Sequence, residues 1–282
     1  MNILVSLDSN YKKVLEVMLT SLLASNPHNK FNVYVLNSSL SNEDFKEIKY
    51  SLDFGRCRII DIKVDEDQFK DAPLTDRYPK EMYYRILAAK LLPEDIDRIL
   101  YLDPDLIIIN SIKELYNTDL TNMYFAGATH IGRQLNIINE VRLSMSSESE
   151  YINSGVLLMN LELLRREQDE RKVYEYIREN SLKLFLPDQD VINALYGDKT
   201  IIIDAERYNM GEIYYKKIKY LPGGREEKID MKWIVNNTSI IHYYGRNKPW
   251  NDLYLGELDV FYYIYEKKLN DYKELIEEKC MQ

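Results

Sequence analysis

Short apolar runs alternate with amphipathic stretches along the first part of the chain, and this alternation constrains the fold more than any other feature. Strands are predicted at residues 3–7, 31–36, 57–64 and 98–102. Helical patterns separate them at residues 11–25, 41–52 and 80–92. Strands that alternate with helices at this spacing are typical of βαβ units, so we expect an α/β protein with a largely parallel sheet.

The pattern is less regular after residue 105. Further strands are predicted at residues 124–129, 156–160, 200–204 and 239–242, and helices at residues 111–116, 161–166, 168–180, 187–196 and 257–279. Residues 142–150 are polar with few apolar anchors, which predicts a mobile stretch. Residues 211–232 are rich in lysine and tyrosine and are predicted to run over the surface, with Pro222-Gly223-Gly224 as a place where they could bend.

Two carboxylates, Asp103 and Asp105, follow the strand predicted at residues 98–102. Burying both without a partner would carry a large desolvation cost, so they belong at the rim of the sheet. A hard divalent cation such as Mg²⁺ or Mn²⁺ is their natural partner, and such an ion often also holds substrate phosphates. An Asp-Pro-Asp surface turn is common as well, so the motif alone does not establish a metal site.

Asp8 follows the first predicted strand in the same way that Asp103 follows the fourth. Ligands of parallel sheets bind beyond the carboxyl ends of the strands, so Asp8 and Asp103 are expected to share one crevice. The alternative is structural, because Asp8 or Ser9 could simply cap the helix that follows.

Composition excludes several classes of function. The net charge of −9 argues against a nucleic-acid partner, because phosphate neutralisation needs a basic surface. No stretch approaches the ~20 apolar residues of a membrane span, and the N-terminus lacks the basic start of a signal peptide. The chain has two cysteines, Cys57 and Cys280, too few for a disulfide framework, which is typical of a reducing cytoplasm.

Six short segments together carry the strongest functional signal. They are residues 4–11 (LVSLDSNY), 84–85 (YR), 102–105 (LDPD), 153–160 (NSGVLLMN), 186–190 (LPDQD) and 242–250 (HYYGRNKPW). In this order and spacing they resemble the retaining glycosyltransferases of family 8, the group of glycogenin and the bacterial lipopolysaccharide galactosyl- and glucosyltransferases. The resemblance covers nearly the whole chain.

The resemblance implies an α/β protein of the GT-A fold with a mixed, mainly parallel central sheet. It implies a single domain over residues 1–282, with a nucleotide-binding half (1–110), a donor-sugar and acceptor half (111–255) and a C-terminal helix (256–282). The implied reaction is retaining transfer of glucose or galactose from a UDP-sugar to a saccharide or lipid-linked saccharide acceptor. The alternative is a catalytically silent sugar-nucleotide-binding protein of the same fold.

The resemblance also implies a cofactor and a location. The ion would be Mn²⁺, with Mg²⁺ as the alternative, held by Asp103, Asp105 and His242. Lys248 and the backbone of Gly245 would complete a cradle for the diphosphate. The protein would be cytoplasmic and at most peripheral at the inner face of the membrane, because its C-terminus lacks the basic, aromatic-rich tail of some relatives. The oligomeric state stays open.

The donor nucleotide has implied partners in the first half of the chain. Asp8 and Asn10 resemble the residues that bind uracil and ribose, and Tyr11 could stack on the base. Pro104 lies between the two aspartates and removes a backbone donor near the ribose. Arg85 resembles an arginine that contacts the donor sugar and phosphate, although it could also be a solvated charge on a helix face.

The donor sugar would lie in a pocket formed by Asn153, Ser154 and Gly155, with Asp188 and Gln189 at its reactive face. Asp188, Gln189 and Lys248 are the catalytic candidates, although Asp188 could also serve as a helix N-cap. Gln189 as a transient nucleophile is the alternative mechanism, but an amide is a poor nucleophile. We favour front-face attack, with Gln189 stabilising positive charge at the anomeric carbon. We also expect residues 142–150 or 211–232 to close over the bound donor.

Overall fold

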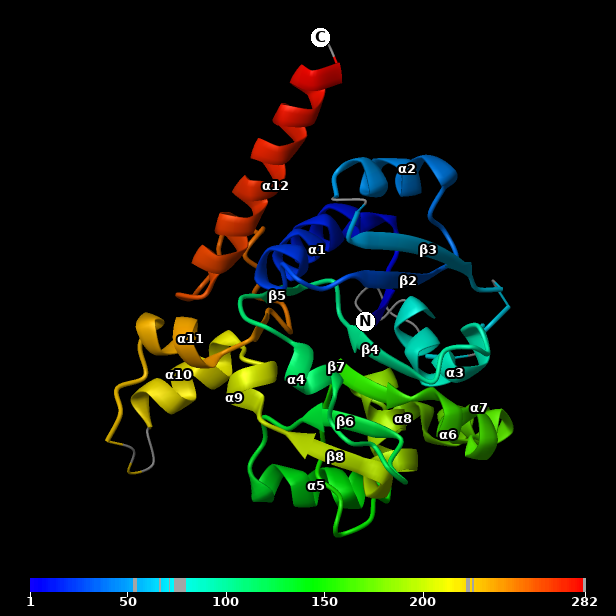
Figure 1. Cartoon of the computed structure of the whole chain (residues 1–282). Coiled ribbons are helices and arrows are strands. Elements are labelled where there is room, and N and C mark those ends of the chain that lie inside the picture. The colour runs from blue at the N-terminus through cyan, green and yellow to red at the C-terminus, as the bar shows by residue number, and fades with distance from the viewer. Residues whose placement is uncertain are drawn as a thin grey trace.

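The computed structural model describes residues 1–52, 55–65, 67–70, 72–73, 80–221, 224 and 226–280 (Figure 1). Its strands are β1 (Asn2–Ser6), β2 (Phe31–Asn37), β3 (Cys57–Lys63), β4 (Arg98–Leu102), β5 (Leu106–Ile108), β6 (Phe125–Ala128), β7 (Asn153–Asn160), β8 (Thr200–Ile203) and β9 (Ile240–His242). Its α-helices are α1 (Lys12–Ser25), α2 (Asn42–Tyr50), α3 (Ala88–Leu91), α4 (Lys113–Tyr116), α5 (Arg133–Leu143), α6 (Leu161–Glu167), α7 (Glu170–Asn180), α8 (Pro187–Tyr196), α9 (Ala205–Tyr208), α10 (Glu212–Tyr220), α11 (Met231–Asn237) and α12 (Asp259–Cys280). Short 3₁₀ segments include η1 (Ser9–Tyr11) and η2 (Lys80–Leu87).

A seven-stranded sheet in the order β3-β2-β1-β4-β7-β6-β8 organises the described part of the chain. The first four strands in this order are parallel, β7 is antiparallel to both of its neighbours, and β8 is parallel to β6. The expected mixed, mainly parallel sheet is therefore confirmed. Strands from the first and second halves of the chain meet at the β4–β7 pair, so one sheet runs through both halves.

The centre of the sheet is apolar on both faces, which explains the unbroken hydrophobic runs of the sequence. Along β4, Ile99 and Tyr101 belong to one hydrophobic cluster and Leu100 and Leu102 to another, as expected when side chains alternate across a strand. All four side chains are fully buried. A strand buried in this way has no room for a carboxylate, and the acidic residues accordingly begin where β4 ends.

A second, two-stranded sheet joins β5 to β9 in antiparallel register, with Leu106 opposite His242. Because β5 starts directly after Asp105, this pairing brings His242 next to the two aspartates. The hydroxyl groups of Ser21 and Ser25 hydrogen-bond the backbone of Ile108 at 2.9 and 2.7 Å and hold β5 against α1.

Helix α12 packs against α1, and its last turns extend past the body of the protein in Figure 1. Ion pairs join Lys13 to Glu266 and Lys273 to Glu16 along this contact. Among the described helices, none combines the length and the apolar character that crossing a membrane requires.

Two predictions about loops need correction. Residues 142–150 are anchored, because Arg142 lies in the last turn of α5, a helix that was not predicted, and Leu143, Met145 and Ser149 are buried. Residues 211–232 contain α10 and the start of α11, with Tyr215 and Ile218 buried, so much of this stretch is helical. The proposed bend at Pro222 and Gly223 lies outside the described residues. Most of the helix predicted at residues 80–92 is 3₁₀, with α-helical geometry only at its end.

Candidate metal centre and ligand pocket

A pocket of about 300 Å³ opens beside the carboxyl ends of β1 and β4. The residues predicted from the sequence that line it are Asp8, Tyr11, Arg85, Asp103, Pro104, Asp105, Asn153, Ser154, Asp188, Gln189, His242, Gly245 and Lys248. Four further lining residues belong to the six segments but had no predicted role: Ser6, Leu7, Leu186 and Tyr244. Sequence analysis missed the lining residues Glu81 and Met82. The fold therefore brings side chains from six separated segments to one place.

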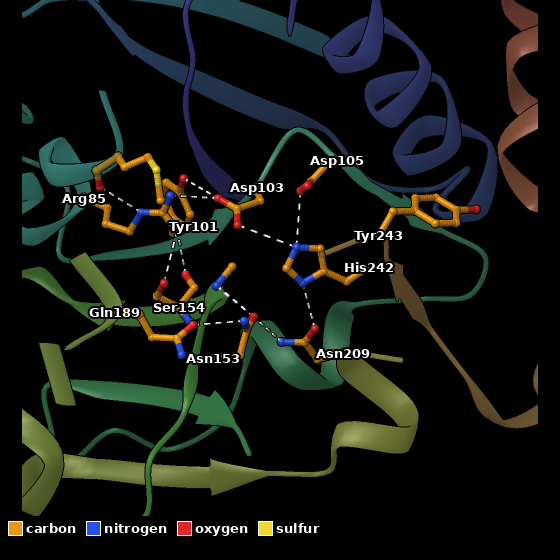
Figure 2. A network of polar contacts seen from close by, with 12 residues as sticks. Arg85, Tyr101, Asp103, Asp105, Asn153, Ser154, Gln189, Asn209, His242 and Tyr243 are labelled. Atoms are coloured by element: carbon orange, nitrogen blue, oxygen red, sulfur yellow. Dashed lines mark hydrogen bonds and ion pairs between the residues drawn. The ribbon is translucent and has the colours of Figure 1, made fainter. Parts of the chain in front are cut away.

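Asp103, Asp105 and His242 form a compact cluster in this pocket, with one ligand atom from each lying within 4.8 Å of the others. His242 Nε2 is 3.2 Å from an Asp105 carboxylate oxygen and 3.6 Å from one of Asp103 (Figure 2). The end of β4 positions the aspartates, and β9 presents the histidine from the second sheet.

The donor set fits a divalent cation. His242 is 1% exposed, and its Nδ1 is hydrogen-bonded to Asn209 at 2.9 Å. Its buried Nε2 has no hydrogen-bond partner within the described ranges. An imidazole lone pair that faces two carboxylates is unfavourable unless a cation lies between them, and oxygen and imidazole ligands together suit Mn²⁺.

Gly155 on β7 leaves the space that this cluster needs. A Cβ atom at this position would lie 2.2 Å from His242 Cε1 and 2.5 Å from a carboxylate oxygen of Asp103. The Gly155 carbonyl accepts a hydrogen bond of 2.8 Å from the Asp103 backbone N–H. A side chain at residue 155 is therefore incompatible with the present positions of two of the three candidate ligands.

Lys248 lies on the opposite side of Asp105 from His242. Its ammonium group donates to the Asp105 carboxylate and, at 2.7 Å, to the carbonyl of Tyr243. Burial works to raise the pKa of Asp105, but the Lys248 ammonium beside it holds this pKa well below its ordinary value. Asp105 is thus ionised, as a metal ligand must be. The neighbouring Gly245 adopts a left-handed φ of 85° in the loop that leads to Lys248.

Arg85 is a buried charge and not the solvated helix-face residue that the sequence left open. It is 3% exposed and lies between two carboxylates, at 2.9 Å from Asp103 and 3.3 Å from Asp188. It also donates to the Ser154 carbonyl at 3.1 Å and stacks 4.2 Å from the Tyr101 ring centre. Burial raises the pKa of Asp188. The Arg85 side chain therefore couples the candidate metal site to the wall that carries Asp188.

Gln189 lies beside Asp188 at the start of α8 and is held by two donors. Its Oε1 accepts from Asn153 Nδ2 at 3.0 Å and from the Ser154 backbone N–H at 3.2 Å. The next contact in this network is Asn209, which donates to Asn153 at 3.0 Å (Figure 2). Sequence analysis missed Asn209, because no local pattern marks it.

The residues predicted to bind the nucleotide are only partly in place. Asp8 accepts from the Asn10 backbone N–H at 2.9 Å, so it caps η1 and also lines the pocket. The Asn10 side chain donates to Asp8 at 3.3 Å and is not among the lining residues. Tyr11 lines the pocket and meets Trp250 edge-on, with ring centres 6.2 Å apart.

The mixed sheet and its carboxylate cluster define the class of protein. A mainly parallel sheet with an Asp-x-Asp motif and a histidine at its carboxyl rim is the arrangement of a GT-A glycosyltransferase, which confirms the predicted fold. The chain belongs to glycosyl transferase family 8, whose family model matches residues 2–254. The resemblance read from the six segments is thereby confirmed.

Relatives of known name are similar over most of their length. The lipopolysaccharide 1,2-glucosyltransferase of Escherichia coli K12 is 26% identical over 255 residues, which cover 89% of this chain and 73% of that protein. The general stress protein A of Bacillus subtilis is 27% identical over 259 residues, 89% of this chain and 87% of that protein. The lipopolysaccharide 1,3-galactosyltransferase of Salmonella typhimurium is 24% identical over 95% of this chain and 78% of its own.

Among solved structures, the galactosyltransferase LgtC in complex with donor and acceptor sugar analogs superimposes with a TM-score of 0.80. It is 23% identical, and the match covers 95% of this chain and 96% of that one. The glycosyltransferase GlyE of Streptococcus pneumoniae has a TM-score of 0.70 at 21% identity, over 99% of this chain and 63% of its own. At these identities the two structures establish the fold alone.

Proposed function

We propose that the chain is a retaining hexosyltransferase that moves glucose or galactose from a UDP-sugar to a saccharide acceptor, with Mn²⁺ as its cofactor and Mg²⁺ as the alternative ion. The observation that carries this proposal is the Nε2 of His242, which faces two carboxylates in the pocket and has no hydrogen-bond partner among the described residues. The family, and the names of relatives that act on lipopolysaccharide, support a saccharide or lipid-linked saccharide acceptor.

The pocket would stabilise the negative charge that builds up on the diphosphate as it leaves. Asp103, Asp105 and His242 would hold the ion, which when bound supplies a Lewis acid for the leaving phosphates. Lys248, at the same rim, would add a second positive charge to the diphosphate, and the Gly245 backbone would approach it closely. Such preorganised charges act strongly in a pocket that excludes water.

The nucleotide would bind along the β1 side of the pocket. Asp8 and Asn10 would hydrogen-bond uracil and ribose, Tyr11 would stack on the base, and Pro104 would lie beside the ribose. For this role the Asn10 amide must leave Asp8 and turn into the pocket. Arg85 would contact the donor sugar and phosphate from the pocket wall, where its guanidinium already pairs with the carboxylate of Asp103.

The sugar would lie against Asn153, Ser154 and Gly155, with Asp188 and Gln189 at its reactive face. We favour front-face attack, in which the acceptor hydroxyl adds on the side from which the phosphate leaves and the departing phosphate takes the proton. The held amide oxygen of Gln189 would stabilise positive charge at the anomeric carbon. Asp188 would hold Ser154 in position, because its carboxylate accepts a hydrogen bond of 3.0 Å from the Ser154 hydroxyl.

We further propose that residues 1–110, 111–255 and 256–282 work as one GT-A domain in the cytoplasm, with no more than peripheral membrane contact. The β4–β7 pair supports the single domain, because it joins strands from the first two parts.

Turnover of UDP-glucose and UDP-galactose, with and without Mn²⁺, tests the proposed function. We expect slow metal-dependent hydrolysis of one donor even without acceptor, with a sugar product of unchanged anomeric configuration at early times by NMR. Tight UDP binding with Mn²⁺ and no turnover of any UDP-sugar would identify a silent binding protein instead.

A further inference from the structure

A chain of side-chain amides, buried at both ends and half-buried at Asn153, connects the candidate metal ligand His242 to Gln189 at the sugar wall (Figure 2). Asn209 contacts His242 Nδ1 through its Oδ1 at 2.9 Å and Asn153 Oδ1 through its Nδ2 at 3.0 Å. Asn153 Nδ2 continues to Gln189 Oε1 at 3.0 Å. Asn209 is fully buried and Gln189 is 7% exposed, so both ends of this chain are shielded from water.

Two backbone N–H groups of β7 determine the direction of this chain. The Ser154 N–H lies 3.2 Å from Gln189 Oε1, and the Gly155 N–H lies 3.1 Å from Asn153 Oδ1. A backbone N–H can only donate, so each of these side-chain atoms must be the amide oxygen. Asn153 must therefore turn its NH₂ group towards Gln189, and its oxygen is left to accept from Asn209.

The same constraint reaches the imidazole. Because the NH₂ group of Asn209 is turned towards Asn153, its oxygen faces His242. In the neutral imidazole, an oxygen opposite Nδ1 requires that Nδ1 carries the single ring proton, and the Nε2 lone pair is then directed at Asp103 and Asp105. This is the tautomer that can bind a cation between the three groups.

We propose that Asn209 is a positioning residue that holds His242 in its metal-binding tautomer and, through Asn153, ties the orientation of Gln189 to the metal centre. The role in turnover rests on the proposed function, whereas the tautomer is a property of the protein alone. The Asn209 backbone is itself fixed, since its N–H donates to Ala205 at 3.0 Å and its carbonyl faces His130 Nε2 at 2.6 Å.

The Asn209→Leu variant tests the tautomer. Without the amide acceptor, the imidazole proton should move to Nε2, where the carboxylates of Asp103 and Asp105 can accept it. Long-range ¹H–¹⁵N spectra of the metal-free protein distinguish the two tautomers, and comparison with His242→Gln assigns the signal. Binding of Mn²⁺ alone, followed by electron paramagnetic resonance, should weaken roughly ten- to a hundredfold, the usual effect of losing such a partner.

The Asn209→Asp variant separates the tautomer from the amide chain. Its carboxylate still accepts from Nδ1, so the wild-type tautomer and a Mn²⁺ affinity at least equal to wild type are expected. It cannot donate to Asn153, so Asn153 and Gln189 lose their fixed direction and UDP-sugar turnover should fall. This variant also serves as the test if Asn209→Leu does not fold.

Asn26→Leu is the matched control, because Asn26 is another buried amide with contacts to Leu22 and Ile112, away from the pocket. It should change neither the tautomer nor the Mn²⁺ affinity. The proposal is overturned if Asn209→Leu keeps the Nδ1–H tautomer and wild-type Mn²⁺ affinity, if Asn209→Asp loses Mn²⁺ as Asn209→Leu does, or if Asn209→Asp turns over donor normally. A wild-type protein that lacks turnover would contradict the proposed function, and the tautomer measurement would still decide the role of Asn209.

Discussion

The ammonium group of Lys248 occupies one side of the Asp105 carboxylate, the same carboxylate that the candidate metal site requires. The Lys248 side chain is only 12% exposed, and it neutralises a buried charge while no cation is bound. A metal ion and Lys248 would therefore compete for the negative charge of the Asp105 carboxylate. Both would stabilise the diphosphate of a bound donor.

Replacing Lys248 with Met should separate these two effects. Without the competing ammonium, Asp105 should bind Mn²⁺ about tenfold more tightly in the absence of donor. Turnover should fall by roughly 10²-fold, because the variant lacks one positive charge that would stabilise the leaving diphosphate. Calorimetric titration with Mn²⁺ and steady-state kinetics measure the two quantities. Lys267→Met, at an exposed surface pair with Asp271, should change neither. Weaker Mn²⁺ binding in Lys248→Met would mean that the lysine supports the site instead of competing for it.

Asp103→Asn should remove Mn²⁺-dependent turnover by at least about 10²-fold while leaving the fold intact. The amide keeps the size of the side chain but lowers its affinity for a hard cation. Donor turnover together with circular dichroism decides the case. Asp119→Asn, where the exposed carboxylate accepts from the backbone N–H and the hydroxyl of Thr121, is the control. Retained Mn²⁺-dependent activity in Asp103→Asn would remove this residue from the metal site.

Gly155→Ala should disturb the metal centre through shape alone. The added Cβ would meet His242 at 2.2 Å and the Asp103 carboxylate at 2.5 Å, so both must move apart. We expect Mn²⁺ affinity to drop by about tenfold or more, as it does when metal ligands lose their orientation. In Gly132→Ala the new Cβ has no neighbour within 4 Å, so its affinity should match wild type. Equal affinities in the two variants would show that the ligand cluster is more adaptable than its packing indicates.

Arg85→Met should cost about 3–5 kcal/mol of unfolding free energy, because it leaves a buried carboxylate without its partner. Adding Asp188→Asn should recover part of that loss, since Asp188 is the more deeply buried of the two carboxylates that Arg85 neutralises. Urea unfolding of both single variants and the double variant measures this coupling. Arg166→Met, at an exposed pair with Glu167, should stay near wild type. Simple additivity of the two single substitutions would argue against the coupling.

His130 should make the folded protein sensitive to acid. Burial lowers its pKa to about 4, whereas the unfolded chain takes up this proton near pH 6.5. Its contribution to stability is therefore complete above about pH 6.5 and is lost as the pH falls towards 4, by about 3 kcal/mol in total. Between pH 6.5 and 4, the unfolding free energy of the wild type should fall more steeply with decreasing pH than that of His130→Gln. His28→Gln, at an exposed position, should follow wild type. Parallel curves for wild type and His130→Gln would contradict a neutral, partly buried imidazole in the folded protein.

The parts of the fold that could be predicted are those with a local cause. The run from Ile99 to Leu102 is apolar because β4 is covered on both faces, and the acidic pair after it marks the rim. Helix α5 was missed because its apolar residues face solvent and a polar residue faces the protein, the reverse of the usual amphipathic pattern. Its apolar Leu135, Ile138 and Val141 are exposed, while Asn136 on the covered face bonds the backbone of residues 149 and 151.

In the candidate site as well, local motifs predicted some residues, whereas others could be recognised only in the folded protein. Asp103, Asp105 and His242 belong to short motifs, so sequence alone could name them. Arg85 was predicted as a donor contact through the Tyr84-Arg85 segment, but its burial could not be predicted, because nothing near it in the chain shows that two carboxylates from other segments surround it. Asn209 lies between segments that meet only in the folded protein, and its direction follows from backbone N–H groups far away in the sequence.

The pairing of β5 with β9 also determines when the pocket can work during synthesis. Lys248 and Asp105 are 143 positions apart, and β9 leaves the ribosome after every strand of the large sheet. A nascent chain therefore carries the two aspartates long before it has His242 or Lys248. Under the proposed function, a polypeptide that terminates before residue 242 cannot consume nucleotide sugar, so the cell loses no donor to unfinished copies of the enzyme.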